Sequence, residues 1–219
     1  MRPQPSRVRP GLHQQHHSRS EEQHADPDPV DVEPRVPQNP QAGWTPLFNG
    51  RDLSGWNGDP QYWRAENGVI VGETTAENPL SQNTFIVWEG GPLENFTLRV
   101  DFRLSAGNSG IQYRSQVLEG WSAGGYQADM DFANRYTGML YEERGRGIVA
   151  TRGQQVVIEP DGRFNVVGAV GDPQALGRTI DMSDWNTYEI TAIDNHLVHR
   201  VNGRVTVDVT DNQVEERSM

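Results

Sequence analysis

Hydrophobic and polar residues alternate along several short stretches of this chain. In the clearest stretch, Phe96–Leu104, every second side chain is apolar and the residues between are Thr, Arg and Asp. A period of two is typical of a β-strand that buries one face. The same alternation at Thr187–Ile193 and Val205–Val209 predicts two more strands.

Shorter runs of the same kind predict further strands, at Phe85–Trp88, Ile111–Arg114, Tyr126–Phe132, Met139–Glu142 and Val156–Ile158. The pairs Asn67-Gly68, Asp194-Asn195 and Asn202-Gly203 are residues that tolerate the positive φ of tight hairpins. Sustained helical periodicity is absent from the sequence. We therefore predict an all-β fold, a two-sheet antiparallel jelly-roll sandwich.

The first 43 residues differ from the rest in composition. They hold eight of the 14 prolines and no aromatic residue, so they lack the means to build a core. Such a composition predicts a disordered extension over residues 1–43 and a folded domain over 44–219. A secretory signal would need an apolar segment of about 7–15 residues, and this part of the chain contains none.

Composition excludes several classes of function. The chain has no cysteine and no lysine, which removes thiolate metal sites, cysteine nucleophiles and Schiff-base chemistry. A net charge of -11 argues against a nucleic-acid partner, which requires a basic surface. The longest apolar stretches fall well short of the ~20 residues of a membrane-spanning helix.

One predicted strand carries a candidate site. Gln127, Asp129 and Asp131 alternate and so should share one face, where two carboxylates repel unless a proton, an arginine or a metal intervenes. The pattern resembles the E-x-D-x-E strand of laminarinase-type retaining glycosidases. Glutamine, however, takes the place of the nucleophile that retention requires. The alternative interpretation is a solvated acidic strand face.

Neighbouring residues extend this candidate site. Gln112 and Arg114 should lie on one side of the preceding strand, where Arg114 could face the acids. Glu143 belongs to a charged turn, and His199 is either a packed strand residue or a general acid/base. Aromatic residues near the acidic strand, Trp121 and Tyr141 among them, are of the kind that pack against sugar rings.

Several motifs resemble the 3-keto-disaccharide hydrolase family. The opening WTPLFNGRDLSGW (Trp44–Trp56) is similar to the family's first motif. The others follow in the family's order, at Asn67–Ile70, Asn95-Phe96, Gly107–Ile111, Thr137–Tyr141, Asp184–Ile190 and His199–Gly203. The resemblance implies a concanavalin A-like sandwich and a carbohydrate substrate, a glycoside already oxidised at C3.

The resemblance also implies a chemistry that needs no carboxylate nucleophile. A C3 ketone acidifies the C2 proton, a base removes it, the C1 substituent leaves, and water adds to the enone. We expect Asp129 as the base and Arg114 as the group that polarises the carbonyl or anchors the substrate. His199 is expected as a substrate contact or a proton shuttle. The expected substrate contacts are Gln127, Tyr141, Gln112 and Trp121. Asp131 and Glu143 are expected as ligands of a divalent metal ion or as acid partners.

Three further expectations and one alternative function complete the interpretation. Family members place a glutamate and a glutamine where this chain has Gln127 and Asp129, so the acidic group is shifted by one pleat. They also continue into one or two further strands, which predicts that this chain is truncated at its C-terminus. The family resemblance favours a periplasmic or extracellular location. The main alternative function is a non-catalytic carbohydrate-binding module on the same sandwich.

Overall fold

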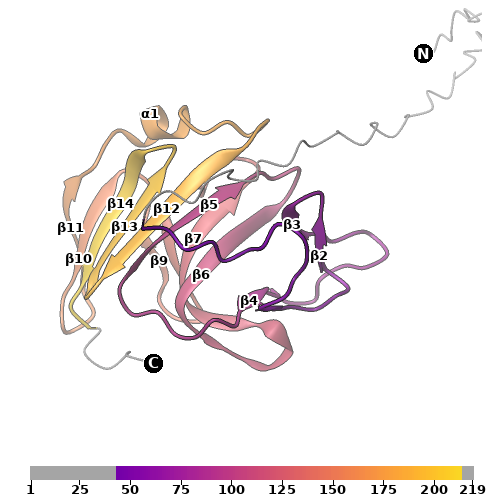
Figure 1. Ribbon diagram of the computed structural model, residues 1–219. Helices are drawn as coiled ribbons and strands as arrows, with labels where there is room; N and C mark the ends of the chain where they lie inside the picture. The colour runs from indigo at the N-terminus through magenta and orange to yellow at the C-terminus, as the bar shows by residue number, and fades with distance from the viewer. Residues whose placement is uncertain (1–42, 214–219) are drawn as a thin grey trace, which may run out of the picture. The chain divides into compact units, whose positions relative to one another are not determined.

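Two β-sheets pack face to face in the described part of the chain, residues 43–213 of a computed structural model (Figure 1). The six-stranded sheet has the order β11 (Phe164–Ala169), β10 (Gln154–Ile158), β14 (Arg204–Asp211), β13 (His196–Val201), β12 (Asn186–Ile193), β5 (Phe96–Phe102). The four-stranded sheet has the order β6 (Asn108–Val117), β7 (Ala123–Asp131), β8 (Leu140–Glu143), β9 (Gly147–Ala150). The predicted all-β sandwich is confirmed.

The remaining elements are small. Two-residue strands β1 (Trp56–Asn57) and β4 (Val87–Trp88) pair with each other, as do β2 (Trp63–Glu66) and β3 (Val69–Gly72). A 3-10 turn, η1, covers Glu119–Trp121, and a single short helix, α1, covers Pro173–Gly177 within the described residues. The Asp172 side chain caps α1 by accepting a hydrogen bond from the Ala175 amide at 2.7 Å.

Three predicted hairpin turns adopt the backbone that their residues favour. Asn67 and Gly68, between β2 and β3, have φ of 48° and 78°. Asn202 and Gly203, between β13 and β14, have φ of 48° and 76°. Asp194, the first residue of the β12–β13 turn, has a φ of 50°. Two consecutive positive φ values match the right-handed twist of the joined strands, which is why Asn-Gly fixes the β2–β3 and β13–β14 hairpins.

The core lies between the two large sheets. The four-stranded sheet contributes Tyr113, Tyr126, Ala128 and Leu140, and the six-stranded sheet contributes among others Tyr188, Ile190, Val201, Val207 and Val209. Each inward side chain alternates with an outward polar one, as in β12, where Thr187, Glu189 and Thr191 are more exposed than their neighbours. This alternation is the pattern from which the strands were predicted.

One strand pairing departs from the antiparallel prediction. β14 runs parallel to β10, with Val156 opposite Val209 and Ile158 opposite Asp211, while every other pairing within residues 43–213 is antiparallel. The predicted disordered extension lies outside the described residues, apart from Gly43. The predicted truncation concerns the chain beyond residue 213, which also lies outside them.

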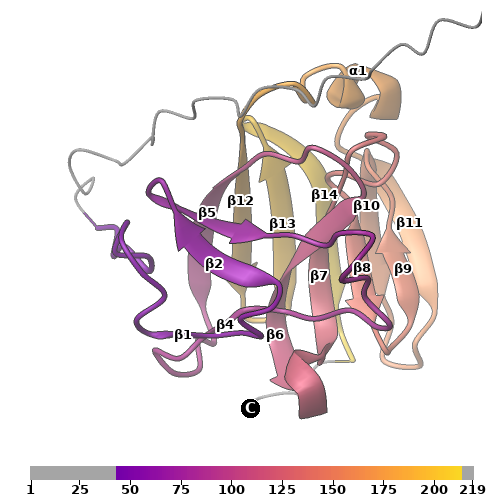
Figure 2. The ribbon, with the colours of Figure 1, turned by 90° about the vertical axis from the view of Figure 1, so that its right-hand side faces the viewer.

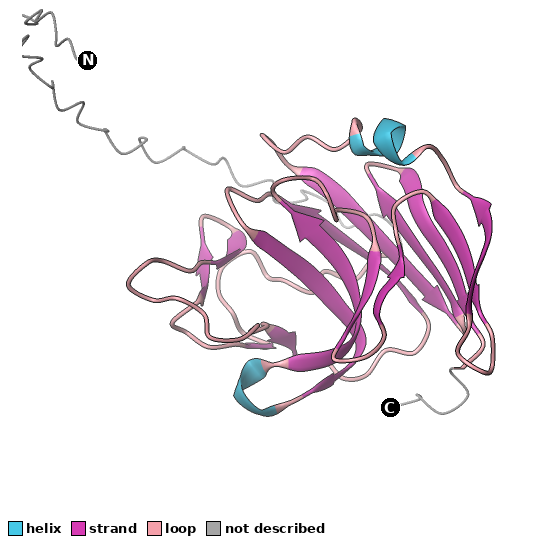
Figure 3. Cartoon of the chain, turned by 180° about the vertical axis from the view of Figure 1, so that it is seen from behind, coloured by secondary structure: helices cyan, strands magenta, loops and turns pink. Residues whose placement is uncertain are grey.

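The segment that carries β1–β4 lies against the four-stranded sheet. Figures 1 and 3, from opposite sides, place β2 and β3 beyond that sheet, away from the six-stranded sheet, and Figure 2 shows them in front of it. Two hydrogen bonds join this segment to the β6–β7 connection, Trp121 Nε1 to Asn57 Oδ1 at 2.8 Å and the Phe85 amide to the Trp121 carbonyl at 2.8 Å. We call the face turned toward this segment the outer face.

Candidate functional site

Strand β7 presents its polar residues on the outer face. Tyr126, Ala128 and Met130 are buried in the core, while Gln127 and Asp129 between them are partly exposed. Each of these polar residues has a cross-strand neighbour: Gln127 lies opposite Gln112 on β6 and Tyr141 on β8, and Asp129 lies opposite Gly110. The outer face therefore gathers one carboxylate, two amides and a phenol within two adjacent rows.

Asp129 is the titratable group of this face with a strongly shifted pKa. Burial raises the pKa of Asp129 from 3.8 to about 6, with smaller contributions from the charges of Asp131 and Glu143. A hydrogen bond from Gln127 Nε2 to Asp129 Oδ1, at 2.5 Å, acts in the opposite direction. Asp129 is thus a carboxylate that titrates close to neutral pH, as a general base requires.

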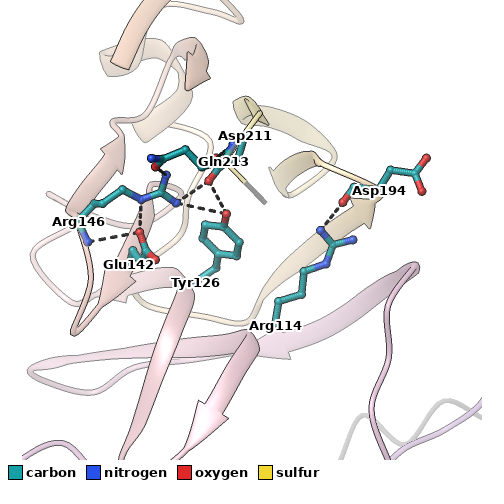
Figure 4. Close-up of polar contacts among 7 residues, drawn as sticks. All are labelled: Arg114, Tyr126, Glu142, Arg146, Asp194, Asp211 and Gln213. Carbon is teal, nitrogen blue, oxygen red and sulfur yellow. Dashed lines mark hydrogen bonds and ion pairs between the residues drawn. The ribbon is translucent and has the colours of Figure 1, made fainter. Parts of the chain in front are cut away.

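Arg114 does not lie beside Asp129, contrary to the expectation from alternation. A β-bulge interrupts the β6–β7 pairing between Tyr113 and Gln116, and Arg114 has a φ of 45°. The guanidinium is directed away from Asp129, and donates to the carbonyl oxygens of Glu94 at 2.7 Å and of Asp194, as Figure 4 shows for the latter. Arg114 therefore fastens β6 to the β12–β13 turn.

Asp131 stabilises a loop. Its Oδ1 accepts hydrogen bonds from the amides of Tyr136 at 2.6 Å and Thr137 at 3.0 Å, and its Oδ2 accepts one from the Arg135 amide at 3.1 Å. The residue is 6% exposed. Backbone donors therefore occupy both oxygens, and they hold together the connection from β7 to β8.

The predicted metal ligands are not brought together. Glu143 lies opposite Gly125, four residues along β7 from Asp129, a separation of about 13 Å at ordinary strand rise. Its Oε2 lies 3.4 Å from Asn83 Nδ2. Among residues 43–213 no three His, Asp or Glu side chains converge as metal ligands. This donor set does not fit a divalent ion held by Asp131 and Glu143.

His199 belongs to the core and not to the outer face. Its ring is fully buried between two tyrosines: Nε2 lies 2.8 Å from the Tyr113 hydroxyl and Nδ1 lies 3.1 Å from the Tyr188 hydroxyl. Burial lowers the pKa of His199 from 6.5 to about 3. His199 is therefore a packed, neutral strand residue and does not lie where a general acid/base of the outer face would.

Trp121 lies at the opposite end of β7 from Asp129. It ends the 3-10 turn before β7, and six residues of strand, about 20 Å, separate Ala123 from Asp129. Its indole nitrogen is used in the bond to Asn57. Two surface depressions also lie away from Asp129, one beside Gln82, Gly120 and Arg144 and the other beside α1.

Two residues belong to the site although the sequence pattern did not predict them there. Ser115 Oγ donates to Gln112 Oε1 at 2.6 Å, because the bulge turns Ser115 toward the outer face. A Cβ at Gly110 would lie 2.5 Å from Gln127 Cδ, so this glycine makes room for the Gln127 amide. An isolated glycine in a strand is a recognisable sign that another group approaches the backbone closely. The sequence contains no comparable pattern that predicts the bulge.

A comparison with protein families gives a match over most of the chain. The model of the 3-keto-alpha-glucoside-1,2-lyase-like domain matches residues 43–219. The chain belongs to this family. The family resemblance drawn from the motifs is therefore confirmed, and the match spans all the described strands.

Solved structures with a similar fold have low sequence identity to this chain. One, a "putative glycosyl hydrolase" from Parabacteroides distasonis, is 22% identical, with 79% of this chain and 74% of that chain covered and a TM-score of 0.48. Another, the carbohydrate binding module CBM66 from Bacillus subtilis, is 16% identical, with 75% and 82% covered and a TM-score of 0.41. No curated protein gives a significant match.

Between residues 43 and 213, none of the helices has the length and apolar character to cross a membrane.

Proposed function

We propose that this protein cleaves the glycosidic bond of 3-keto-glycosides, with Asp129 as the general base. The observation that carries the proposal is the half-buried Asp129 carboxylate on the outer face, with a pKa raised to about 6. Membership of the 3-keto-alpha-glucoside-1,2-lyase-like family supports the substrate class. A base of this kind is ionised above pH 6 and still basic enough to accept a proton from carbon next to a ketone.

The reaction follows from the chemistry of the ketone. Asp129 takes the C2 proton, and the electron pair of the C2–H bond forms the enolate of the C3 ketone. Collapse of the enolate breaks the bond from C1 to its oxygen, and the leaving alkoxide takes a proton from water. The hydroxide left by that water adds to C1 of the resulting enone, and the protonated Asp129 returns a proton to C2, which gives the free 3-keto sugar and restores the carboxylate. The Tyr141 phenol, one strand away from Gln127, is the proposed contact to the sugar.

The first experiment incubates the protein with a 3-keto glucoside in heavy water and follows products by mass spectrometry. We expect release of 3-ketoglucose that carries deuterium at C2, or of the enone, which has no hydrogen at C2. Asp129→Asn should lower the rate by about 10²–10⁴-fold, the usual cost of removing a general base. Asp101→Asn, on the six-stranded sheet, is the matched control and should keep the wild-type rate.

Three results would contradict the proposal. Full turnover by Asp129→Asn would remove the base role. Saturable binding of unoxidised sugars without any product would favour a carbohydrate-binding module. Hydrolysis of an unoxidised aryl glycoside would favour a conventional glycosidase.

A further inference from the structure

Four side chains on the outer face form a continuous line of hydrogen bonds that ends at Asp129. Ser115 Oγ donates to Gln112 Oε1 at 2.6 Å, Gln112 Nε2 donates to Gln127 Oε1 at 2.7 Å, and Gln127 Nε2 donates to Asp129 Oδ1 at 2.5 Å. We call this line the Ser115 relay. Each amide accepts through its oxygen and donates through its nitrogen, so every link has the same direction.

The direction of the relay depends on its two ends. If both amides turned over, Gln127 would present its oxygen to an ionised carboxylate oxygen, which is repulsive. At the other end Ser115 has one proton, and its Oγ lies nearer to Gln112 Oε1 than to the carbonyl oxygens of Tyr113, at 2.9 Å, and Tyr126, at 3.4 Å. The hydroxyl and the carboxylate therefore favour the same orientation of both amides.

The backbone brings these groups within reach. The bulge at Tyr113–Gln116 shifts the register of β6, so Ser115 and not Arg114 accompanies Gln112 on the outer face. The hydrogen bonds of Arg114 to Glu94 and Asp194 hold that bulge in place. Gly110, opposite Asp129, leaves the space that the Gln127 amide occupies.

From this geometry we infer that Ser115, Gln112 and Gln127 are positioning residues: their relay fixes Asp129 Oδ1 and leaves Oδ2 as the atom that accepts the substrate proton. Within the described residues Oδ1 is hydrogen-bonded to Gln127, whereas Oδ2 receives no hydrogen bond. A carboxylate held by one oxygen cannot turn freely, so its second oxygen keeps a defined direction. The inference rests on the proposed base role of Asp129 and assigns Gln127 and Gln112 to orienting that base.

The test measures the pKa of Asp129 directly, from the carboxyl ¹³C chemical shift in labelled protein, together with the pH profile of kcat/KM on a 3-keto glucoside. Gln127→Met removes the donor to Oδ1 and should raise both the pKa and the acidic limb of the profile by about one pH unit. Ser115→Ala should shift both in the same direction by less, and Ser115→Thr should restore them. Gln116→Ala, exposed at the same bulge, is the control and should match the wild type.

The outcomes separate the relay from the proposed function. An unchanged Asp129 pKa in Gln127→Met, or a rate loss in Ser115→Ala without any shift of the acidic limb, would overturn the relay. A shifted pKa in a protein that releases no product would leave the relay in place and remove the base role instead. The two relay variants report independently, so a folding defect in one leaves the other as the test.

Discussion

At the scale of single residues, the proposed function of Asp129 and the stability of the fold oppose each other. The carboxylate is partly withdrawn from water, and within residues 43–213 its one side-chain hydrogen bond comes from the Gln127 amide. A raised pKa means that the folded protein holds the neutral acid better than the unfolded chain does. The ionised carboxylate that the proposed reaction needs is therefore formed at a cost in folding free energy.

This opposition predicts the effect of Asp129→Asn on stability. The folded pKa of about 6 lies above the ordinary 3.8, so the stability that this group contributes is complete below pH 3.8 and is lost as pH rises through 6. Asparagine keeps an acceptor for Gln127 and carries no charge. At pH 8 we expect Asp129→Asn to be more stable by about 1–2 kcal/mol, after allowance for solvent screening.

Urea unfolding at pH 8 and pH 4 measures this difference. The gain should shrink toward zero at the lower pH, where the wild-type carboxyl is itself protonated. A gain of equal size at both pH values would mean that the substitution acts through packing and not through ionisation.

The sequence predicted which face of β7 Gln127 and Asp129 share better than it predicted which other residues lie near them. The alternation of Gln127 and Asp129 was sufficient to place both on one face, because β7 is regular over these residues. Arg114 was misplaced because a single bulge reverses the side chains that follow it. Asp131 was misplaced as a metal ligand because its backbone partners come from a loop whose conformation the strand pattern does not encode.

At the scale of elements, a buried ionic cluster ties the β8–β9 turn to β14. Arg146 forms ion pairs with Glu142 and Asp211, whose side chains are 2% and 0% exposed, and Tyr126 donates to Asp211 Oδ2 at 2.5 Å (Figure 4). Burial pushes the pKa of Asp211 upward, but hydrogen bonds from Arg146 and Tyr126 hold it below its ordinary value. The cluster thus replaces hydrophobic packing where the two sheets meet.

Removal of the cation from this cluster should be costly. In Arg146→Ala the buried Asp211 carboxylate loses its counter-ion, and we expect a loss of about 3–5 kcal/mol in the free energy of unfolding. Arg163→Ala is the matched control because its ion pair with Asp161, at 2.7 Å, is exposed and should leave unfolding unchanged. Chemical denaturation of both variants at neutral pH makes the comparison, and equal losses would contradict it.

Local rules predicted which strands form, but only in part how they pair. Period-two alternation and Asn-Gly turns fix hairpins because neighbouring strands bury one face each and meet through a short turn. The parallel pairing of β14 with β10 joins segments about fifty residues apart, with Gln155 opposite Asp208, and no local pattern specifies it. The same holds for the β1–β4 segment beside the outer face, since among residues 43–213 its short strands pair only with one another.

At the scale of the whole molecule, buried groups with opposite pH dependence lie in the same sandwich. Asp129 contributes more stability as pH falls, whereas the buried neutral His199 contributes less. The imidazole is held between the Tyr113 and Tyr188 hydroxyls, which join the two large sheets through the core. His199 therefore couples protonation to the contact between the sheets.

This coupling predicts how acid unfolds the protein. The pKa of His199 falls from 6.5 to about 3 in the folded state. Between these two pH values the unfolded chain binds a proton at His199 and the folded protein does not. The stability contributed by neutral His199 is complete above pH 6.5 and is lost as pH falls toward 3. Between those limits the slope should approach about 1.4 kcal/mol per pH unit from this one group.

His199→Gln removes the titrating group and so tests the slope itself. The variant should be less stable than the wild type at pH 7, because a core side chain is altered, but the gap should narrow steadily as pH falls to 4.5. His196→Gln, at the exposed start of the same strand, is the control and should leave most of the wild-type pH dependence in place. A constant gap between wild type and His199→Gln from pH 7 to 4.5 would show that His199 is not the group that couples acid to the separation of the sheets.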